Sequence, residues 1–143
     1  MAIFFHNADI NPQLKHKTAL KRWMRDQILS ENHEVGTINV IFCSDHYLIE
    51  VNRTHLNHDY YTDIITFDYC EDKLVSGDLY ISFERVLENS SKFQKTAQNE
   101  LYRVIIHGVM HLCGYKDKTK SEAILMRQKE EIALQKIQQY LNS

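Results

Sequence analysis

The sequence has little of what marks fibrous, disulfide-bonded or membrane proteins. Among its 143 residues are one proline and four glycines, too few for a collagen-like or low-complexity chain. The three cysteines (Cys43, Cys70 and Cys113) form no C-x-x-C pair, which argues against a disulfide framework and suits a reducing compartment. No apolar run has the length of a membrane span, and no basic stretch precedes the short apolar run at the start, as in a signal peptide. We therefore expect a cytoplasmic protein that does not span a membrane.

The chain also lacks the excess of basic residues that is typical of nucleic-acid-binding proteins. Its net charge is -2 and its pI is about 6.4, so any contact with RNA must come from a local basic face. The densest basic region is formed by Lys17, Lys21, Arg22 and Arg25, which is equally typical of a solvated helix face. With 43% hydrophobic and 25% charged residues, the chain can bury a core as one domain spanning residues 1–143.

The spacing of apolar residues predicts both strands and helices. Short β-branched, aromatic or apolar runs indicate the strands, and apolar residues at helical spacing indicate the helices. The predicted strands are 2–6, 34–43, 64–67 and 79–81, and the predicted helices are 15–29, 45–55, 83–89, 98–113 and 120–141. Because short connections join neighbouring strands, we expect an α+β fold, a small mixed sheet of about four strands with helices packed on it. The pattern does not specify the order of the strands.

Two histidines in the predicted helix 98–113 mark the segment that carries the chemistry. His107 and His111 are four residues apart, so their side chains lie on the same face, one turn above the other. This helix is apolar nearly all round and is therefore expected to be buried. Two buried imidazoles without partners would cost roughly a few kcal/mol, a cost that a shared metal ion removes.

The residues after this helix bring a carboxylate toward the histidines. Gly114 suits a helix end in the left-handed conformation, after which the chain reverses direction. Thr119 and Glu122 form a capping-box pattern that begins the next helix. Asp117 therefore lies in a short connection between two helix ends, where it can serve as a third ligand.

The resulting pattern, H-x-x-x-H-x-x-G-x-x-D, predicts one Zn²⁺, or another divalent metal, bound by His107, His111 and Asp117. Two imidazoles and one carboxylate leave a coordination position open, as catalytic zinc requires. Cys113 is a conceivable fourth ligand, but it points to another side of the helix. Zinc proteases with similar spacing need a glutamate directly after the first histidine, and Gly108 occupies that position. A peptidase of that type is therefore disfavoured.

With this segment, the sequence resembles the YbeY family of bacterial rRNA-maturation endoribonucleases, whose pattern is H-G-x-L-H-L-x-G-Y-D-H. The matching residues are His107, Gly108, His111, Leu112, Gly114 and Tyr115. Two other stretches, 52–67 and 77–82, are similar to the family's N-R … D-x-P-T-D-V-L-S-F and G-D-I-x-I-S segments. The resemblance spans roughly the whole chain.

Three positions depart from the family pattern. Asp117 replaces the last histidine, and because a carboxylate is also a zinc ligand, metal binding is expected to be retained with altered strength or selectivity. Leu56 aligns with a family arginine associated with catalysis or RNA binding, and leucine cannot hold a phosphate. Arg53, His55 or His58 would then take over that role, or the role is lost. Tyr61 replaces a proline, which loosens the loop.

The resemblance implies a zinc-dependent endoribonuclease that hydrolyses single-stranded RNA. It also implies a role in maturing the 3′ end of the small-subunit rRNA and in ribosome quality control, with the ribosome or small-subunit proteins as partners. We predict that Arg53 and Lys116 join His107, His111 and Asp117 in catalysis. The other charged or polar candidates near the metal are Tyr115, Lys118, His58 and Asp63. RNA contacts are expected from the basic face of residues 17–25 and from Tyr60 and Tyr61.

Two other functions fit the same residues. One is a non-enzymatic ribosome-assembly factor with a structural metal, which the leucine at position 56 favours. The other is a metallohydrolase that acts on a small molecule or a peptide. A metal site saturated by four protein ligands would favour the assembly factor, whereas an open coordination position that faces a cleft would favour an enzyme.

Overall fold

The computed structural model describes residues 2–142 and contains the four strands and five helices that the sequence predicts. In chain order they are β1 (Ala2–Asn7), α1 (Lys17–Ser30), β2 (Glu34–Cys43), α2 (Asp45–Leu56), β3 (Ile64–Asp68), β4 (Leu74–Ser82), α3 (Phe83–Lys92), α4 (Ala97–Leu112) and α5 (Lys120–Leu141). Within the described part of the chain, no helix combines the length and the apolar character that crossing a bilayer requires. The largest departure from prediction is β4, which starts at Leu74 rather than Leu79, because Val75 and Gly77 continue its buried alternation.

The strands form one mixed sheet in the order β1-β2-β4-β3. Strands β1, β2 and β4 are parallel neighbours, and β3 runs antiparallel to β4 at the far edge. Parallel strands need crossover connections, and α1 supplies the one between β1 and β2. The α+β class and the mixed sheet predicted from sequence are therefore confirmed. The antiparallel β3 matters for the site, because it places its edge of the sheet beside the carboxyl-terminal half of α4.

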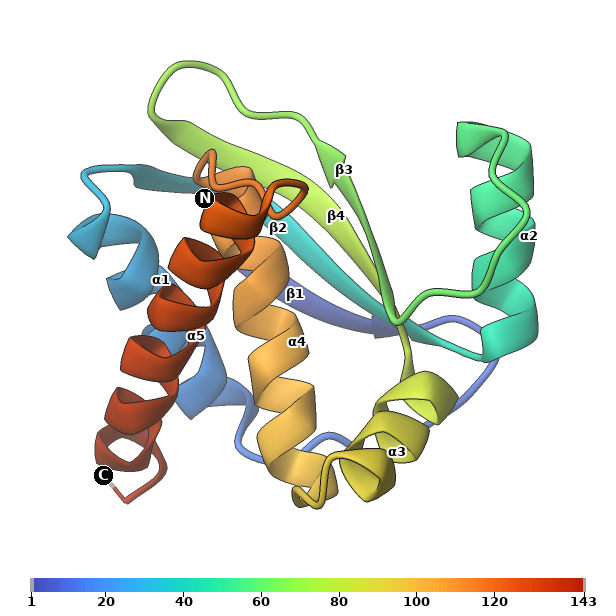
Figure 1. Cartoon of the computed structure of the whole chain (residues 1–143). Coiled ribbons are helices and arrows are strands. Elements are labelled where there is room, and N and C mark those ends of the chain that lie inside the picture. The colour runs from blue at the N-terminus through green and yellow to red at the C-terminus, as the bar shows by residue number, and fades with distance from the viewer. Residues whose placement is uncertain (1, 143) are drawn as a thin grey trace.

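The helices are divided unequally between the two faces of the sheet (Figure 1). Helices α1, α4 and α5 lie over one face, where the main hydrophobic core forms. Helix α2 packs on the other face against β3 and β4, through a small cluster that contains Leu48 and Ile65. Since the side chains of a strand alternate between faces, Ile64 joins the main core while its neighbour Ile65 packs under α2.

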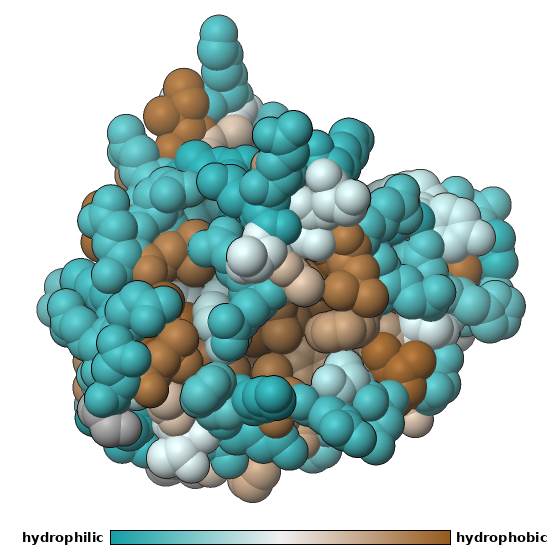
Figure 2. Space-filling model, turned by 90° about the horizontal axis from the view of Figure 1, so that it is seen from below, coloured by the Kyte–Doolittle hydropathy of each residue, from teal (hydrophilic) through white to brown (hydrophobic). Residues whose placement is uncertain are grey.

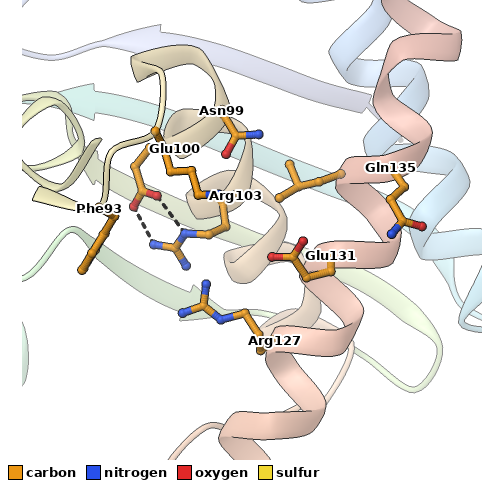
Figure 3. A pocket seen from close by; sticks show the side chains of 9 residues that line it. Phe93, Asn99, Glu100, Arg103, Arg127, Glu131 and Gln135 are labelled. Carbon is orange, nitrogen blue, oxygen red and sulfur yellow. Dashed lines mark hydrogen bonds and ion pairs between the residues drawn. The ribbon is translucent and has the colours of Figure 1, made fainter. Parts of the chain in front are cut away.

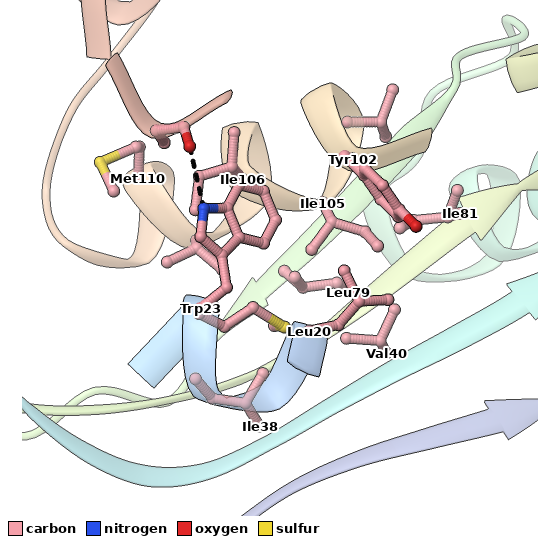
Figure 4. Close-up of a cluster of buried hydrophobic side chains, with 14 of the residues drawn as sticks. Leu20, Trp23, Ile38, Val40, Leu79, Ile81, Tyr102, Ile105, Ile106 and Met110 are labelled. Carbon is pink, nitrogen blue, oxygen red and sulfur yellow. Dashed lines mark hydrogen bonds between the residues drawn. The ribbon is translucent and has the colours of Figure 1, made fainter. Parts of the chain in front are cut away.

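Helix α4 runs through the centre of the main core, as its all-round apolar sequence predicts. Ile105 and Ile106 are fully buried between the sheet and the neighbouring helices (Figure 4). The indole N–H of Trp23 in α1 donates a 2.9 Å hydrogen bond to the carbonyl oxygen of Ala133 in α5. This bond ties the two outer helices together beside α4. A helix held on so many sides offers a rigid base for the histidines that it carries.

Gly108 lets α4 approach the sheet closely. A Cβ atom at this position would lie 2.8 Å from Cδ1 of Ile64 and 3.0 Å from Cδ2 of Leu79. The family's glycine next to the first histidine therefore has a packing role here, because it brings α4 against β3 and β4. The close approach places His107 and His111 at the edge of the sheet that β3 forms.

The turn after α4 has the geometry expected from its sequence. Gly114 adopts a φ of 104°, in the left-handed region that favours glycine. The Thr119 hydroxyl accepts from the backbone N–H of Glu122, whose side chain bonds back to the N–H of Thr119, so the predicted capping box is present. Both ends of the connection 113–119 are thus fixed, and Asp117 is held between them.

Seen from below, the molecule has a recess lined by apolar side chains in an otherwise largely hydrophilic surface (Figure 2). An apolar cavity of about 180 Å³ lies where α4 begins, with Phe42, Phe83, Leu101 and Tyr102 in its lining. These side chains carry little acid–base chemistry. The two histidines of the predicted site lie instead at the carboxyl-terminal end of α4, beside the buried carboxylate of Glu130 in α5.

Candidate metal centre

The three predicted ligands converge on one point. Nε2 of His107 lies 3.1 Å from Nε2 of His111 and 3.2 Å from Oδ2 of Asp117. Nε2 of His111 lies 3.5 Å from the same carboxylate oxygen. Ligand atoms bound at about 2.0–2.1 Å to a tetrahedral zinc ion are about 3.4 Å apart. The triangle therefore has the size that a single zinc-sized ion requires.

The hydrogen bond between His107 and Glu130 supports a metal ion at the point where the three predicted ligands converge. Nδ1 of His107 donates to Oε2 of Glu130 over 2.6 Å, so Nε2 is the ring nitrogen with a free lone pair. A ring nitrogen lone pair and a carboxylate oxygen 3.2 Å apart repel each other unless a positively charged species lies between them. A cation satisfies such a set of electron-pair donors, and the donor types are those that zinc prefers.

Glu130 belongs to a buried ionic network that joins α4 to α5. Its side chain is only 3% exposed, and its Oε1 accepts from Nη1 of Arg103 over 3.2 Å. Arg103 also holds both carboxylate oxygens of Glu100, at 2.9 and 2.6 Å. Burial raises the pKa of Glu130, but the hydrogen bond and charge of His107 and the charge of Arg103 lower it more, so the net shift is downward. Glu130 thus remains an anion that orients His107.

The three predicted ligands open onto a cleft of about 570 Å³ between α4, β3 and the end of α2. Its lining includes Asn52, Leu56, His58, Tyr60, Asp63 and Lys118, together with the three ligands. Oδ2 of Asp63 lies 3.8 Å from Nη2 of Arg103, and burial raises the pKa of this carboxyl group. The cleft therefore places acid, base and cationic groups around the three ligand atoms.

Within residues 2–142, the ligand group comprises His107, His111 and Asp117, with no fourth histidine, cysteine or carboxylate. Cys113 packs against the main core, and burial raises the pKa of its thiol to about 12, which disfavours the thiolate that binds metal. A metal held by the three ligands would keep a coordination position toward the cleft. By the criterion set from the sequence, this favours an enzyme over a structural metal site.

The structure brings only some of the other predicted residues to the cleft. His58, Asp63 and Lys118 line it, whereas Arg53 and Lys116 do not. The Arg53 guanidinium instead pairs with Glu50 at 2.7 Å and with Asp59 at 2.5 Å. Lys116 is exposed on the connection after α4. The catalytic roles predicted for these two residues stay predictions.

The remaining candidates lie farther from the ligands. The Tyr115 hydroxyl donates to Glu31 over 2.5 Å and does not line the cleft. Lys21 and Arg25 of the predicted basic face lie beside β1, at the opposite edge of the sheet from β3. Tyr60 lines the cleft, whereas Tyr61 lies outside its lining, under the guanidinium of Arg85. A strand of RNA in the cleft would therefore meet Tyr60 before it met the basic face of α1.

The sequence analysis missed Glu130, Glu100 and Arg103. A signal for Glu130 was present, because Met126, Glu130, Ala133 and Ile137 recur at helical spacing and form the buried stripe of α5. A carboxylate within such a stripe must have a buried partner. The pattern does not reveal that the partner is His107.

Three side chains with metal-binding atoms converge at a cleft of an α+β protein, which makes the chain a candidate metalloprotein. Comparison with known proteins narrows this class. Residues 4–138 match the sequence model of the family described as "Endoribonuclease YbeY". The chain belongs to this family.

The similarity to curated relatives extends over nearly the full length of both chains. "Endoribonuclease YbeY" of Flavobacterium psychrophilum is 49% identical over 87% of this chain and 89% of its own. The protein of the same name from Cytophaga hutchinsonii is 45% identical over 92% and 93% of the two chains, and that from Bacteroides fragilis is 47% identical over 94% and 96%. A solution structure of a Thermotoga maritima protein has a TM-score of 0.69 and 29% identity, covering 94% of this chain and 88% of that one. The fold is therefore shared with a protein solved by experiment.

Proposed function

We propose that this protein is a zinc-dependent endoribonuclease that cuts single-stranded RNA and acts in maturing the 3′ end of the small-subunit rRNA and in ribosome quality control. The observation that carries the proposal is the convergence of His107, His111 and Asp117 at a cleft. The relatives described above carry the name endoribonuclease, which supports RNA as the substrate. Its partners would be rRNA and the ribosome or small-subunit proteins, in the cytoplasm.

The chemistry follows from what the side chains around the ligands can do. A zinc ion bound at the three ligands would supply an activated water and polarise a phosphoryl oxygen. Glu130 keeps the Nδ1 proton of His107 in place, so that Nε2 remains a ligand. Asp63 lies in the cleft with its pKa raised by burial, and it can therefore exchange a proton with the reacting groups. Lys118 provides a positive charge for the phosphate.

The wall of the cleft fits an unpaired base better than a duplex. Tyr60 is 55% exposed, and its ring stacks on that of His58 at a centroid distance of 5.2 Å. The buried side chain of Asn52 donates to the carbonyl oxygen of Tyr60 over 3.0 Å, which fixes this loop to the end of α2. A base of a single strand can stack on such an exposed ring, whereas bases in a duplex are not accessible for stacking.

The proposal is tested by elemental analysis of the purified protein together with RNA cleavage. We expect one zinc ion per chain, cleavage of single-stranded RNA in preference to duplex RNA, and loss of cleavage on chelation. His107→Ala should lose both metal and cleavage while keeping the fold. His46→Ala, which removes an exposed histidine at the start of α2, is the matched control and should keep both.

The possible results separate the alternatives. Cleavage that persists in His107→Ala after chelation would refute a catalytic metal. Tightly bound metal without cleavage of any RNA would favour the assembly factor with a structural ion. Hydrolysis of generic esters or peptides without RNA cleavage would favour a different metallohydrolase.

A further inference from the structure

A second cavity, of about 370 Å³, lies in the groove between α4 and α5 beside the end of α3 (Figure 3). Its size falls within the range of sites for small ligands. Phe93 and Lys95 contribute from the segment between α3 and α4, Arg103 from α4, and Arg127 and Glu131 from α5. Figure 3 shows the guanidinium groups of Arg103 and Arg127 facing each other across this space.

Two of the three cations around the cavity are exposed and only weakly engaged by carboxylates. Arg103 is held by two carboxylates, those of Glu100 and Glu130. The Arg127 side chain is 62% exposed, and its one ion pair within residues 2–142 is with Glu130, at 4.0 Å, which Arg103 already contacts. Lys95 is exposed and forms no ion pair with the residues that the structure describes. Lys95, Arg103 and Arg127 together match Glu100, Glu130 and Glu131, so the wall carries no net charge. Glu100 and Glu130 are buried against Arg103, however, and the two exposed cations, Lys95 and Arg127, remain available to pair with a phosphate.

An aromatic ring stands beside these cations. Phe93 is 51% exposed, although a phenylalanine gains from burial, and it contributes to the wall of the cavity. Exposed aromatic rings next to lysine and arginine are the features by which proteins hold single-stranded nucleic acids, through base stacking and phosphate contacts. A nucleotide carries both chemical groups that this wall would recognise.

The cavity adjoins the metal centre through the buried ionic network. Arg103 and His107 are one turn apart on α4, about 6 Å along its axis. Glu130 contacts both of them, and Asp63 of the cleft lies 3.8 Å from Arg103. The Arg103–Glu130 pair thus lies between the second cavity and the cleft at the predicted metal ligands. A strand that crosses the metal centre along α4 would reach the second cavity within about one or two nucleotides.

We propose that this second cavity binds a nucleotide of the RNA strand next to the cleaved bond, with the base on Phe93 and a phosphate between Lys95 and Arg127. The proposal rests on the proposed endoribonuclease function and extends it to a substrate-positioning surface. The cleaved phosphate itself would remain at the metal ligands. Phe93, Lys95 and Arg127 are therefore binding residues and leave the metal centre unchanged.

The test is the salt dependence of RNA binding by the metal-loaded chain. Binding of a fluorescein-labelled single-stranded RNA is followed by anisotropy at low temperature, with a gel to show that the RNA is intact after each reading. The double variant Lys95→Gln/Arg127→Gln should bind about tenfold more weakly. The slope of log K against log salt should become shallower by about 1.4, since each lost phosphate contact on a single strand changes it by about 0.7.

Two further variants separate stacking from charge. Phe93→Ala should weaken binding about fivefold or more with an unchanged salt slope, because it removes stacking alone. Lys136→Gln removes an exposed charge from α5 outside both cavities and should leave affinity and slope as in the wild type. All variants should retain the metal content of the wild type, which shows that the centre and the fold are intact.

The outcomes distinguish this proposal from the proposed function. If the wild type binds and cleaves RNA while the double variant and Phe93→Ala behave like Lys136→Gln, the cavity assignment is overturned and the endoribonuclease stands. If the wild type neither binds nor cleaves RNA, both fall. A free nucleoside monophosphate that binds as tightly as the strand, and depends on Lys95 and Arg127, would show a site for a free nucleotide and would also overturn the assignment to a strand.

Discussion

The carboxylate of Glu130 in α5 accepts a 2.6 Å hydrogen bond from Nδ1 of His107 in α4. This contact links the three candidate metal ligands, which lie between residues 107 and 117, to a helix that supplies none of them. The ring of His107 is therefore oriented by a residue 23 positions later in the sequence. The order of the site depends on the packing of α5 as much as on α4.

Removing this contact should weaken metal binding. We expect Glu130→Ala to lower zinc affinity by about 10- to 100-fold, as loss of a residue that orients a ligand does. Glu130→Gln should lose less, because its amide oxygen can still accept from Nδ1. Titration against a competing chelator measures both, and Glu131→Gln, one residue away and exposed, is the control. Equal affinities in Glu130→Ala and in the control would show that His107 is oriented without Glu130.

The aspartate that replaces the family's last histidine can be tested by exchange. Asp117→Asn keeps the shape but removes the charge, and we expect zinc affinity to fall by about tenfold or more. Asp117→His supplies an imidazole instead and should retain zinc, because three histidines with one open position form a competent zinc site. Chelator competition provides the measurement, with Glu71→Gln in the β3–β4 hairpin as control. If Asp117→Asn retained wild-type affinity, Asp117 would not be a ligand.

The two lysines after α4 should differ in their contribution to cleavage. Lys118 lines the cleft and Lys116 does not. We expect Lys118→Ala to lower kcat/KM for single-stranded RNA by about tenfold, the size of a lost charged contact to phosphate, and Lys116→Ala to stay within about twofold. Steady-state kinetics on the same RNA decides between them. The reverse result would support the catalytic role that the sequence predicts for Lys116.

Stability in mild acid should depend on Glu31, which follows α1. Its carboxylate accepts from the Tyr115 hydroxyl at 2.5 Å and from Nζ of Lys129 at 2.9 Å. Burial raises the pKa of Glu31, but these hydrogen bonds lower it more, so it lies below its usual value of 4.5. Since the pKa is lower in the folded state than in the unfolded state, the stabilisation is complete above about pH 4.5 and is lost as the pH falls through the folded value.

Urea unfolding with chelator in every buffer measures this effect without a contribution from bound metal. At pH 7 we expect Glu31→Gln to be less stable by about 2 kcal/mol, and the difference from the wild type should shrink toward pH 3. Glu34→Gln changes a nearby exposed carboxylate and should show no such trend. A difference that stays constant from pH 7 to pH 3 would mean that the charge of Glu31 does not act in this way.

Most of the architecture could be predicted because it depends on local signals. Alternation and helical spacing located every strand and helix, and the glycine and capping box predicted how Asp117 returns to the histidines. The start of β4 was placed too late because Ser76 and Gly77 interrupt its apolar residues, although pairing with β2 and β3 holds them in the strand. The order β1-β2-β4-β3 depends on contacts between distant segments, which no local pattern records.

The candidate site, like the fold, was predictable where it depends on neighbouring residues and not where it depends on contacts between distant ones. The three candidate ligands lie within one short segment, so their spacing was sufficient to predict that their side chains converge. The Arg103–Glu130 network joins residues 27 positions apart, and Asp63 approaches Arg103 from β3's side of the sheet. Arg53 was predicted to be catalytic because it is the arginine of the family's N-R motif. In the structure its position on α2 pairs it with Glu50 and Asp59. Whether such residues reach the cleft depends on how distant segments pack together, which the sequence pattern does not show.

Because the ligands lie on one helix and its following turn while the opposite wall of the cleft comes from residues 52–68, the two halves of the cleft can vary independently in evolution. Substitutions in the segment between α2 and β3 would alter which strands enter without disturbing ion binding. The departure at Leu56 lies at the end of α2 and lines the cleft, and the departure at Tyr61 lies in the segment that follows, outside the lining. Ion binding and strand entry are therefore set by separate segments of the chain, which depart from the family pattern at Asp117 on one side and at Leu56 on the other.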